Sequence, residues 1–259
     1  MTGPSKEYID AIKRKDIRFP GVKEYLEKVQ ALMNRAYSMH AEEEAEKRIK
    51  DVALTKGLER QFYLSANEVS KNIGKPCELA GIVSGKTTDS ELLLDEFHVY
   101  QDQQCNGTGY FVPRMGTRKT HDEVSEKRGR PHLAYAHSHD VMGVFHSPID
   151  DLFVMDALKR SPDSESFEIG PYTISAQYVY NIVFNQKGAT PHVEVGILFP
   201  RLTDDGWIYD KTKSIAIVPR IINKRSKNKA YTRLQKEIKE RVTYDDRVYD
   251  HIRETYGNL

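Results

Sequence analysis

The spacing of apolar residues changes twice along the chain, and this constrains the fold more than any other feature of the sequence. Between residues 22 and 39, apolar residues recur every three or four positions, which places them on one face of a helix. Between residues 79 and 218 they form short runs bounded by Gly, Asp, Thr and Ser, a pattern typical of strands. Helical spacing returns over residues 231–242. The pattern predicts an α/β (α+β) fold, with a mixed β-sheet core flanked by helices and helical extensions at both ends.

These changes divide the chain into three predicted segments: a helical N-terminal extension at 1–59, a core domain at 60–220 and a helical tail at 221–259. Within the core, Ser65 opens an S-x-x-E capping box, which predicts a helix that starts there and ends near Gly74. Strands are expected at 79–83, 92–100, 132–137, 172–184, 192–199 and 214–218, and helices at 120–130 and 150–159.

The N-terminal helix has two interpretations. Its apolar stripe over residues 22–39 is followed by a run of charged residues between Glu42 and Lys50. One interpretation is a helix that leaves the body of the protein and shows its charged faces to water. The other is a docking arm for a partner subunit or for a second copy of the chain. The sequence leaves both open.

Composition excludes several classes of protein. The 259 residues carry a formal net charge of +1, so overall charge indicates no particular partner, and 39% hydrophobic residues are enough to form a core. No apolar run approaches the roughly 20 residues that a membrane span needs, and the first residues lack the apolar region of a secretory signal. Cys77 and Cys105 are too few for a disulfide framework or an all-thiolate zinc site. We therefore expect a soluble, cytoplasmic protein.

The most informative stretch for chemistry runs from residue 137 to residue 150. His137 and His139 lie two residues apart at the end of a predicted strand, so their side chains point to the same face. Neutral imidazoles are good zinc ligands, and Asp150 offers a third, oxygen ligand. Three protein ligands leave one position for water, as in catalytic zinc sites. Residues 147–150 also form a helix start with Ser147 as N-cap, which would turn Ser147 and Asp150 towards the histidines.

Other families that carry an H-x-H pair place their further ligands differently. Metallo-β-lactamases have Asp and then His shortly after the pair, where this chain has Val141 and Met142. Cupins have a Glu four or five positions further on, where Gly143 and Val144 stand. Amidohydrolase barrels usually carry the pair near the start of a longer chain. All three families fit poorly.

The stretch resembles the JAMM motif of the MPN metalloprotease family, H-x-H-P-x(6)-S-x-x-D. His137, His139, Ser147 and Asp150 stand in register with its four conserved positions. The family's proline after the second histidine is Asp140 here. Since proline is not a ligand, we expect metal binding to be retained, with an added anionic side chain that affects substrate preference.

A second motif of the family, E-x-x-G-x-x-x-G, is matched upstream by Glu78, Gly81 and Gly85. The resemblance covers about residues 60–200 and implies an MPN-like fold. It also implies Zn²⁺ bound by the two histidines and Asp150, Glu78 as general base and Ser147 as a hydrogen-bond donor to the oxyanion. The implied reaction is hydrolysis of amide or isopeptide bonds, as in deubiquitinases, with a ubiquitin-like protein or its conjugate as substrate.

Two rival functions remain. A non-catalytic MPN scaffold is one, although such members usually lack the metal ligands that this chain retains. Nucleic-acid binding is the other, because the segment between residues 224 and 241 is rich in basic residues and contains Tyr231, although a solvated linker and helix face explain the same pattern.

Two residues next to each other have plainer interpretations. Glu78 would be a solvated carboxylate at the start of a strand, and Cys77 has no His/Asp arrangement that would make it a nucleophile.

Overall fold

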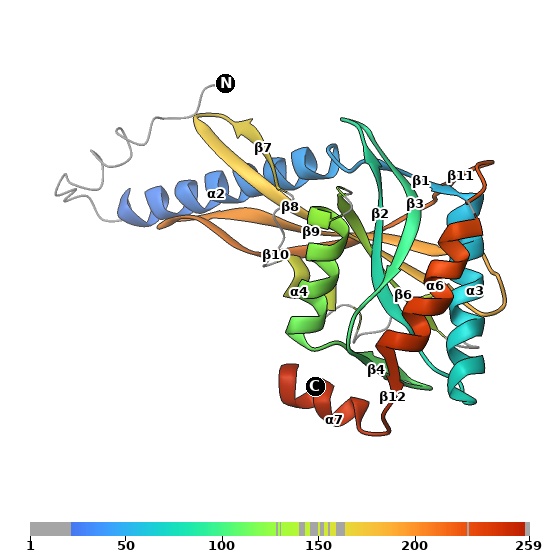
Figure 1. The fold of residues 1–259 in the computed structure, drawn as a ribbon. Helices are drawn as coiled ribbons and strands as arrows, with labels where there is room; N and C mark the ends of the chain where they lie inside the picture. Colours follow the sequence, from blue (N-terminus) through green and yellow to red (C-terminus); the bar gives the residue numbers. More distant parts are fainter. Residues whose placement is uncertain are drawn as a thin grey trace. The chain divides into compact units, whose positions relative to one another are not determined.

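The computed structural model describes residues 22–127, 129, 131–139, 143–145, 150, 153–154, 156–158, 164–226 and 228–256. Its architecture is mixed α/β, as the sequence predicts, with helices packed on a mixed sheet (Figure 1). The strand order of the main sheet is β10-β9-β8-β6-β2-β3-β1-β11, with β7 paired to β8, and a smaller sheet has the order β12-β4-β5.

The helices are α2 (Val22–Glu46), α3 (Lys56–Ile73), α4 (Arg114–Asp122), the π-helix η1 (Glu123–Lys127), α6 (Asn228–Arg241) and α7 (Val248–Tyr256). The strands are β1 (Asp51–Thr55), β2 (Ala80–Thr87), β3 (Glu91–Val99), β4 (Gln103–Asn106), β5 (Gly109–Phe111), β6 (His132–His139), β7 (Ser164–Ile169), β8 (Tyr172–Asn185), β9 (His192–Thr203), β10 (Gly206–Ile217), β11 (Arg220–Ile222) and β12 (Val242–Tyr244). Residues 150, 153–154 and 156–158 are helical, which agrees with the helix expected there.

The chain forms two compact units. The first comprises Met1–Arg48, Ser161–Tyr178 and Ile197–Lys213, and the second comprises Ile49–Arg160, Val179–Gly196 and Ser214–Leu259. Strands β8, β9 and β10 contribute residues to both. Of the predicted site residues, the described ones, Glu78, His137, His139 and Asp150, belong to the second unit.

Helix α2 packs on the strands of the first unit through a face that overlaps only one side of the predicted apolar stripe. Its buried residues are Asn34, Ala41 and Ala45, and the carbonyl of Ala45 accepts a hydrogen bond of 2.9 Å from the Tyr178 hydroxyl. Within the stripe, Leu26, Val29 and Met33 are half-buried, whereas Tyr25 and Leu32 are each 66% exposed and Met39 is 54% exposed. Part of the following charged run is paired rather than solvated, since Glu42 and Glu46 form ion pairs with Lys211 and Lys213 of β10.

The core of the second unit forms where α3 covers the sheet. The Phe62 ring of α3 stacks on Phe184 of β8 with 4.4 Å between centroids, and Phe97 of β3 contacts both rings edge-on. All three side chains are fully buried. Helix α6 lies beside α3 (Figure 1), and its Leu234 and Ile238 are buried at the spacing that the sequence predicts.

The helical extension predicted at 1–59, of which residues 1–21 lie outside the described residues, contains a strand, β1. This strand pairs in parallel with β3 and β11, and its last four residues are buried. The expected helix start at Ser65 is also wrong, because α3 begins at Lys56 with Thr55 as its N-cap; the Thr55 hydroxyl accepts the Leu58 N–H at 3.1 Å. The predicted end is confirmed, since Gly74 caps α3 with φ 75°.

The predicted helical tail at 221–259 contains strand structure as well, because β11 joins the main sheet and β12 pairs in parallel with β4. Its basic residues are partly neutralised. Arg233 pairs with Glu96 of β3 at 3.2 Å, and Arg241 pairs with Glu123 of η1 at 2.8 Å. Half-buried ion pairs of this kind hold the tail on the core, which weakens the interpretation as a face that binds nucleic acid.

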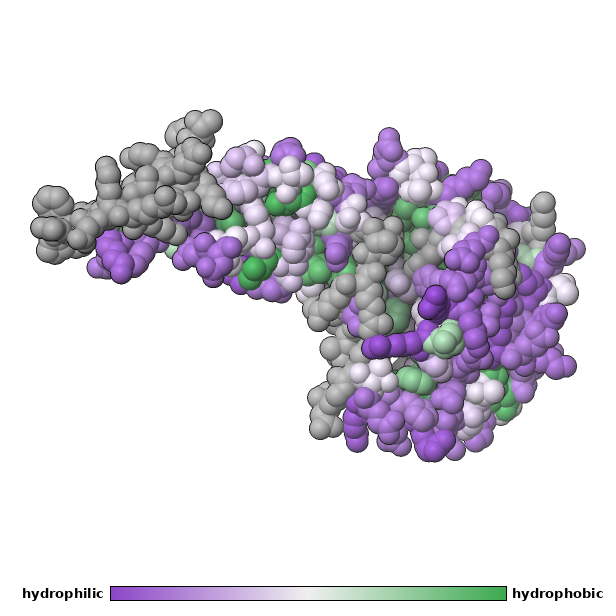
Figure 2. All heavy atoms as spheres, turned by 60° about the vertical axis from the view of Figure 1, so that its left-hand side comes forward, coloured by the Kyte–Doolittle hydropathy of each residue, from purple (hydrophilic) through white to green (hydrophobic). Residues whose placement is uncertain are grey.

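The other expected strands are confirmed with shifts of a few residues, and the polar helix expected at 120–130 begins earlier, at Arg114. On the face drawn in Figure 2, hydrophilic residues cover most of the coloured surface and hydrophobic residues show in small, separate patches. Within the described residues, no helix combines the length and the hydropathy needed to cross a lipid bilayer.

Candidate metal centre

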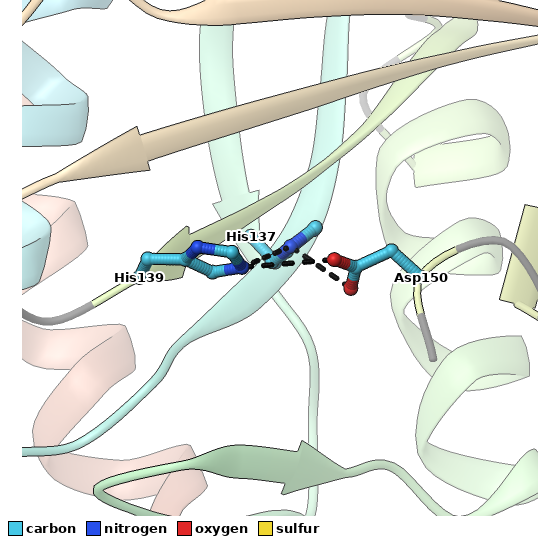
Figure 3. Close-up of side chains that lie close together, drawn as sticks. All are labelled: His137, His139 and Asp150. Atoms are coloured by element: carbon cyan, nitrogen blue, oxygen red, sulfur yellow. Dashed lines mark hydrogen bonds and ion pairs between the residues drawn. The ribbon is translucent and has the colours of Figure 1, made fainter. Parts of the chain in front are cut away.

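His137, His139 and Asp150 come together at the end of β6. The two histidines alternate with Ser138 along the strand, so both rings project from the same face of the sheet. Asp150, in the helical segment that follows, points its carboxylate at both rings (Figure 3). All three residues are buried, and their candidate ligand atoms lie within 4.8 Å of one another.

The separations fit a tetrahedral ion. The Nε2 atoms of His137 and His139 are 3.3 Å apart, and the Asp150 carboxylate oxygens lie 3.1 Å from the first and 3.6 Å from the second. Zinc binds nitrogen and oxygen ligands at about 2.0–2.2 Å, so two ligands of a tetrahedral site lie about 3.3 Å apart. The three side chains therefore stand at separations that suit a shared zinc ion.

A hydrogen bond at Nδ1, the ring nitrogen that does not face the other ligands, fixes the orientation of His139. Its Nδ1 lies 3.1 Å from the carbonyl oxygen of Gly143. Because a carbonyl can only accept, Nδ1 carries the hydrogen, and the lone pair of Nε2 faces the other ligands. This is the tautomer that a metal-binding histidine needs.

The charges around His139 favour a cation. Burial lowers the pKa of His139, but the hydrogen bond to Asp150 and the negative charges of Glu78 and Asp150 outweigh burial, so the net pKa is raised. Glu78 and Asp150 are themselves buried. A buried site with two carboxylates that favours positive charge suits a divalent cation.

Glu78 lies next to this centre, as the sequence predicts. It directly precedes β2, which is antiparallel to β6 with Ala80 opposite His137; continuing this register places Glu78 opposite His139. Hydrogen bonds hold the two chains together there: the N–H of Ser138 donates to the Leu79 carbonyl at 2.7 Å, and the Leu79 N–H donates to the Ser138 hydroxyl at 2.8 Å. Glu78 also lines the same cleft as His139 and Asp150.

Close contacts with the neighbouring strand explain why the second motif has glycine at positions 81 and 85. A Cβ at Gly81 would lie 2.1 Å from the His98 carbonyl oxygen, and a Cβ at Gly85 would lie 2.0 Å from that of Leu93. Only glycine lets β3 approach this closely, and the pairing is irregular between Ser84 and Gly85. The motif thus fixes the strand that follows Glu78.

Two residues of the predicted motif, Ser147 and Asp140, lie outside the described residues. Cys77 and Cys105 are buried free cysteines. The hydrogen bond with Cys77, together with burial, raises the pKa of the Cys105 thiol. This agrees with a structural rather than a nucleophilic role for the pair.

A cleft of about 850 Å³ opens on the candidate metal centre. Glu78, His139 and Asp150 line it. Sequence reasoning missed two contributors to the site. One is the Gly143 carbonyl, which contacts His139 and has no side-chain signal. The other is α7, which lines the cleft from a distant part of the sequence; the apolar spacing of the buried Val248 and Ile252 was the available sign of this helix face.

Comparisons with known proteins assign this chain to no family, so the resemblance to the JAMM motif rests on the residues described above. A scan against models of protein families found no match, and a search of curated proteins found none either. What the chain does is therefore argued below from the geometry and from the motif.

Proposed function

We propose that this chain is a zinc-dependent hydrolase of amide or isopeptide bonds, similar to the JAMM-type enzymes of the MPN family. One observation carries the proposal: His137, His139 and Asp150 meet at the separations that a tetrahedral ion requires, with Glu78 facing His139 across the strand pair. A purely structural cluster would have no need of a neighbouring carboxylate in an open cleft.

The roles of the residues follow from their positions. A zinc ion, when bound, supplies a Lewis acid that brings the pKa of a water to about 7. Glu78 accepts the proton of the attacking water and delivers it to the leaving amine. Ser147, assigned by the motif alone, donates a hydrogen bond to the oxyanion. The Gly143 carbonyl keeps His139 in the ligating tautomer.

The substrate in this proposal is a ubiquitin-like protein or its conjugate, as the family resemblance implies. The free, buried Cys77 and Cys105 are in keeping with the reducing cytoplasm in which we place the enzyme.

The partner in this proposal is a second copy of the chain, bound through α2. The exposed Tyr25, Leu32 and Met39 recur every seven residues, on the side of the helix opposite the buried Asn34 and Ala41. A seven-residue apolar repeat is the seam of a helix pair.

The test compares Glu78→Gln with Glu126→Gln, a control at an exposed carboxylate of η1. Both proteins are loaded with zinc, and the metal content and the cleavage of a panel of ubiquitin-like conjugates are measured, with and without 1,10-phenanthroline. We expect both variants to hold one zinc ion and only Glu78→Gln to lose cleavage, by about 10²-fold or more.

A Glu78→Gln protein that cleaves at the rate of the parent chain would contradict the assignment of Glu78. A parent chain that binds zinc but cleaves no conjugate would favour a non-catalytic scaffold. A folded protein that takes up no zinc would refute the proposal as a whole.

A further inference from the structure

The cleft beside the candidate metal centre is much larger than an ion and a water need. Its volume of about 850 Å³ compares with roughly 30 Å³ for one water molecule. It falls within the range of about 300–1,000 Å³ that is usual for ligand sites. There is room for several residues of a substrate around the bond that is cleaved.

One wall of the cleft is built from β5 and α7. Tyr110 and Phe111 of β5 and Tyr249 and Ile252 of α7 line it. The Tyr249 hydroxyl donates to the Thr108 carbonyl at 3.3 Å, which ties the helix to the hairpin that β5 belongs to. The C-terminal helix therefore forms part of the binding surface and shapes what the cleft accepts.

Two further aromatic side chains extend the apolar lining up to the metal ligands. The ring of Phe145 meets His139 edge-on with 5.1 Å between centroids, and Phe153 meets Tyr135 in the same way at 5.1 Å. Phe145 is 49% exposed although its ring lies beside buried His139. An exposed aromatic ring at this place gives apolar area for a ligand to cover.

The same cleft carries positive charge at α4. Arg114 and Arg118 line it, and their spacing of four residues puts both on one face of the helix. Both are exposed, and Arg118 has a loose pair with exposed Asp122 at 3.9 Å, a contact worth about 0–1 kcal/mol. Asp156 lines the cleft as well and carries the opposite charge. The guanidinium group of an arginine binds a carboxylate through two parallel hydrogen bonds.

We propose, on the basis of the function proposed above, that the cleft selects a peptide segment with a large apolar or aromatic side chain and a carboxylate. The apolar side chain packs between Phe145 and the wall of Tyr249 and Ile252, and the carboxylate binds Arg114 and Arg118. A segment with basic side chains is disfavoured by the same two arginines. Tyr249 and Arg114 are thus specificity residues that the motif does not contain.

Binding is measured apart from cleavage, with fluorescein-labelled pentapeptides and the full-length, zinc-loaded Glu78→Gln protein. Four peptides combine Phe or Ser at the centre with Glu or Lys two positions away. We expect the Phe/Glu peptide to bind about tenfold more tightly than either the Ser/Glu or the Phe/Lys peptide, by fluorescence anisotropy.

Two variants, each in the Glu78→Gln background, assign the preference to residues. Tyr249→Ala removes the preference for Phe over Ser, and Arg114→Glu reverses the preference for Glu over Lys. The matched controls, Tyr63→Ala on α3 and Arg253→Glu on α7, change exposed residues that do not line the cleft and leave both preferences unchanged.

Equal affinities for the four peptides, or no measurable binding, would overturn this inference. So would preferences that survive both cleft variants. Cleavage by the parent chain without any preference would refute the inference and leave the proposed function standing. If the peptides show the expected preferences but the parent chain cleaves no conjugate, the proposed function is refuted and this inference stands.

Discussion

Asp150 supplies the negative charge of the candidate ligand set, since the two histidines ligate as neutral groups. Its carboxylate lies within 3.6 Å of both imidazole nitrogens. Asp150→Asn keeps the size of the side chain and removes this charge. We expect the affinity for zinc to fall by about 100-fold or more, measured by competition with a chromophoric chelator.

The control for this variant is Asp156→Asn, which changes a carboxylate in the same helical segment and the same cleft. It is expected to bind zinc as tightly as the parent chain. If both variants lose zinc equally, the effect comes from the charge of the cleft as a whole and the ligand assignment of Asp150 is wrong.

His121 gives the stability of the protein a pH dependence of known sign. Burial next to Tyr100 and Tyr135 lowers its pKa, against the opposing charge of Asp122. Below pH of about 6.5, the ordinary value, the unfolded chain binds a proton at His121 that the folded chain does not. The contribution of His121 to the free energy of unfolding therefore falls as the pH drops from 7 to 5.

Urea denaturation at pH 7, 6 and 5 tests this by comparison with His121→Gln, which has no group to titrate at this site. The parent chain should lose more stability over this range than the variant. Equal losses in both proteins would mean that other groups cause the pH dependence.

At the scale of elements, α6 depends on one buried carboxylate. Glu237 accepts hydrogen bonds from Arg233 at 3.1 Å and from the Val99 N–H of β3 at 3.2 Å, and it lies 3.7 Å from Arg241. Glu237→Ala leaves the buried Val99 N–H without its acceptor, whereas Arg233 and Arg241 keep their pairs with Glu96 and Glu123. We expect a loss of about 1–3 kcal/mol in the free energy of unfolding, measured in urea.

Glu240→Ala is the matched control on the same helix. Glu240 is exposed and lies 3.9 Å from Lys236, so its loss should cost less than about 0.5 kcal/mol. A Glu237→Ala protein as stable as this control would show that α6 is held by Leu234 and Ile238 alone.

Local patterns predicted much of the fold and of the site. The histidine pair could be predicted from the alternation of side chains along β6 alone. The position of Glu78 follows from the antiparallel register of β2 with β6. Gly74 marks the end of α3 because its positive φ is a property of one residue. Signals of this kind can be read from the sequence because they act over a few neighbouring positions.

Signals that depend on distant partners could not be read in this way. Strand β1 is five residues long and buried between β3 and β11, so its residues show no alternation that marks a strand. Ser65 resembles an N-cap, but its hydroxyl donates to the Gln61 carbonyl within α3. Tertiary pairing, and not local preference, decided both cases.

At the scale of the whole molecule, the candidate site combines segments from distant parts of the chain. Glu78 precedes β2, the histidines end β6, and the wall of the cleft includes α7 near the C-terminus. The small sheet joins the two parts of the cleft wall, because β4 pairs with both β5 and β12, and α7 follows β12. The C-terminal segment predicted as an extension is therefore part of the site's surroundings.

The exposed apolar residues of α2 lead to a prediction about the oligomeric state of the protein. If Tyr25, Leu32 and Met39 pack against a second copy, then Leu32→Glu places a charge in the middle of the contact. The parent chain should be a dimer and the variant a monomer at the same concentration, by light scattering after size exclusion. Ala31→Glu, at an exposed position beside the seam, is the control and should remain dimeric. A monomeric parent chain would rule out this partner and leave the residues of the metal centre unaffected, since they lie in the other compact unit.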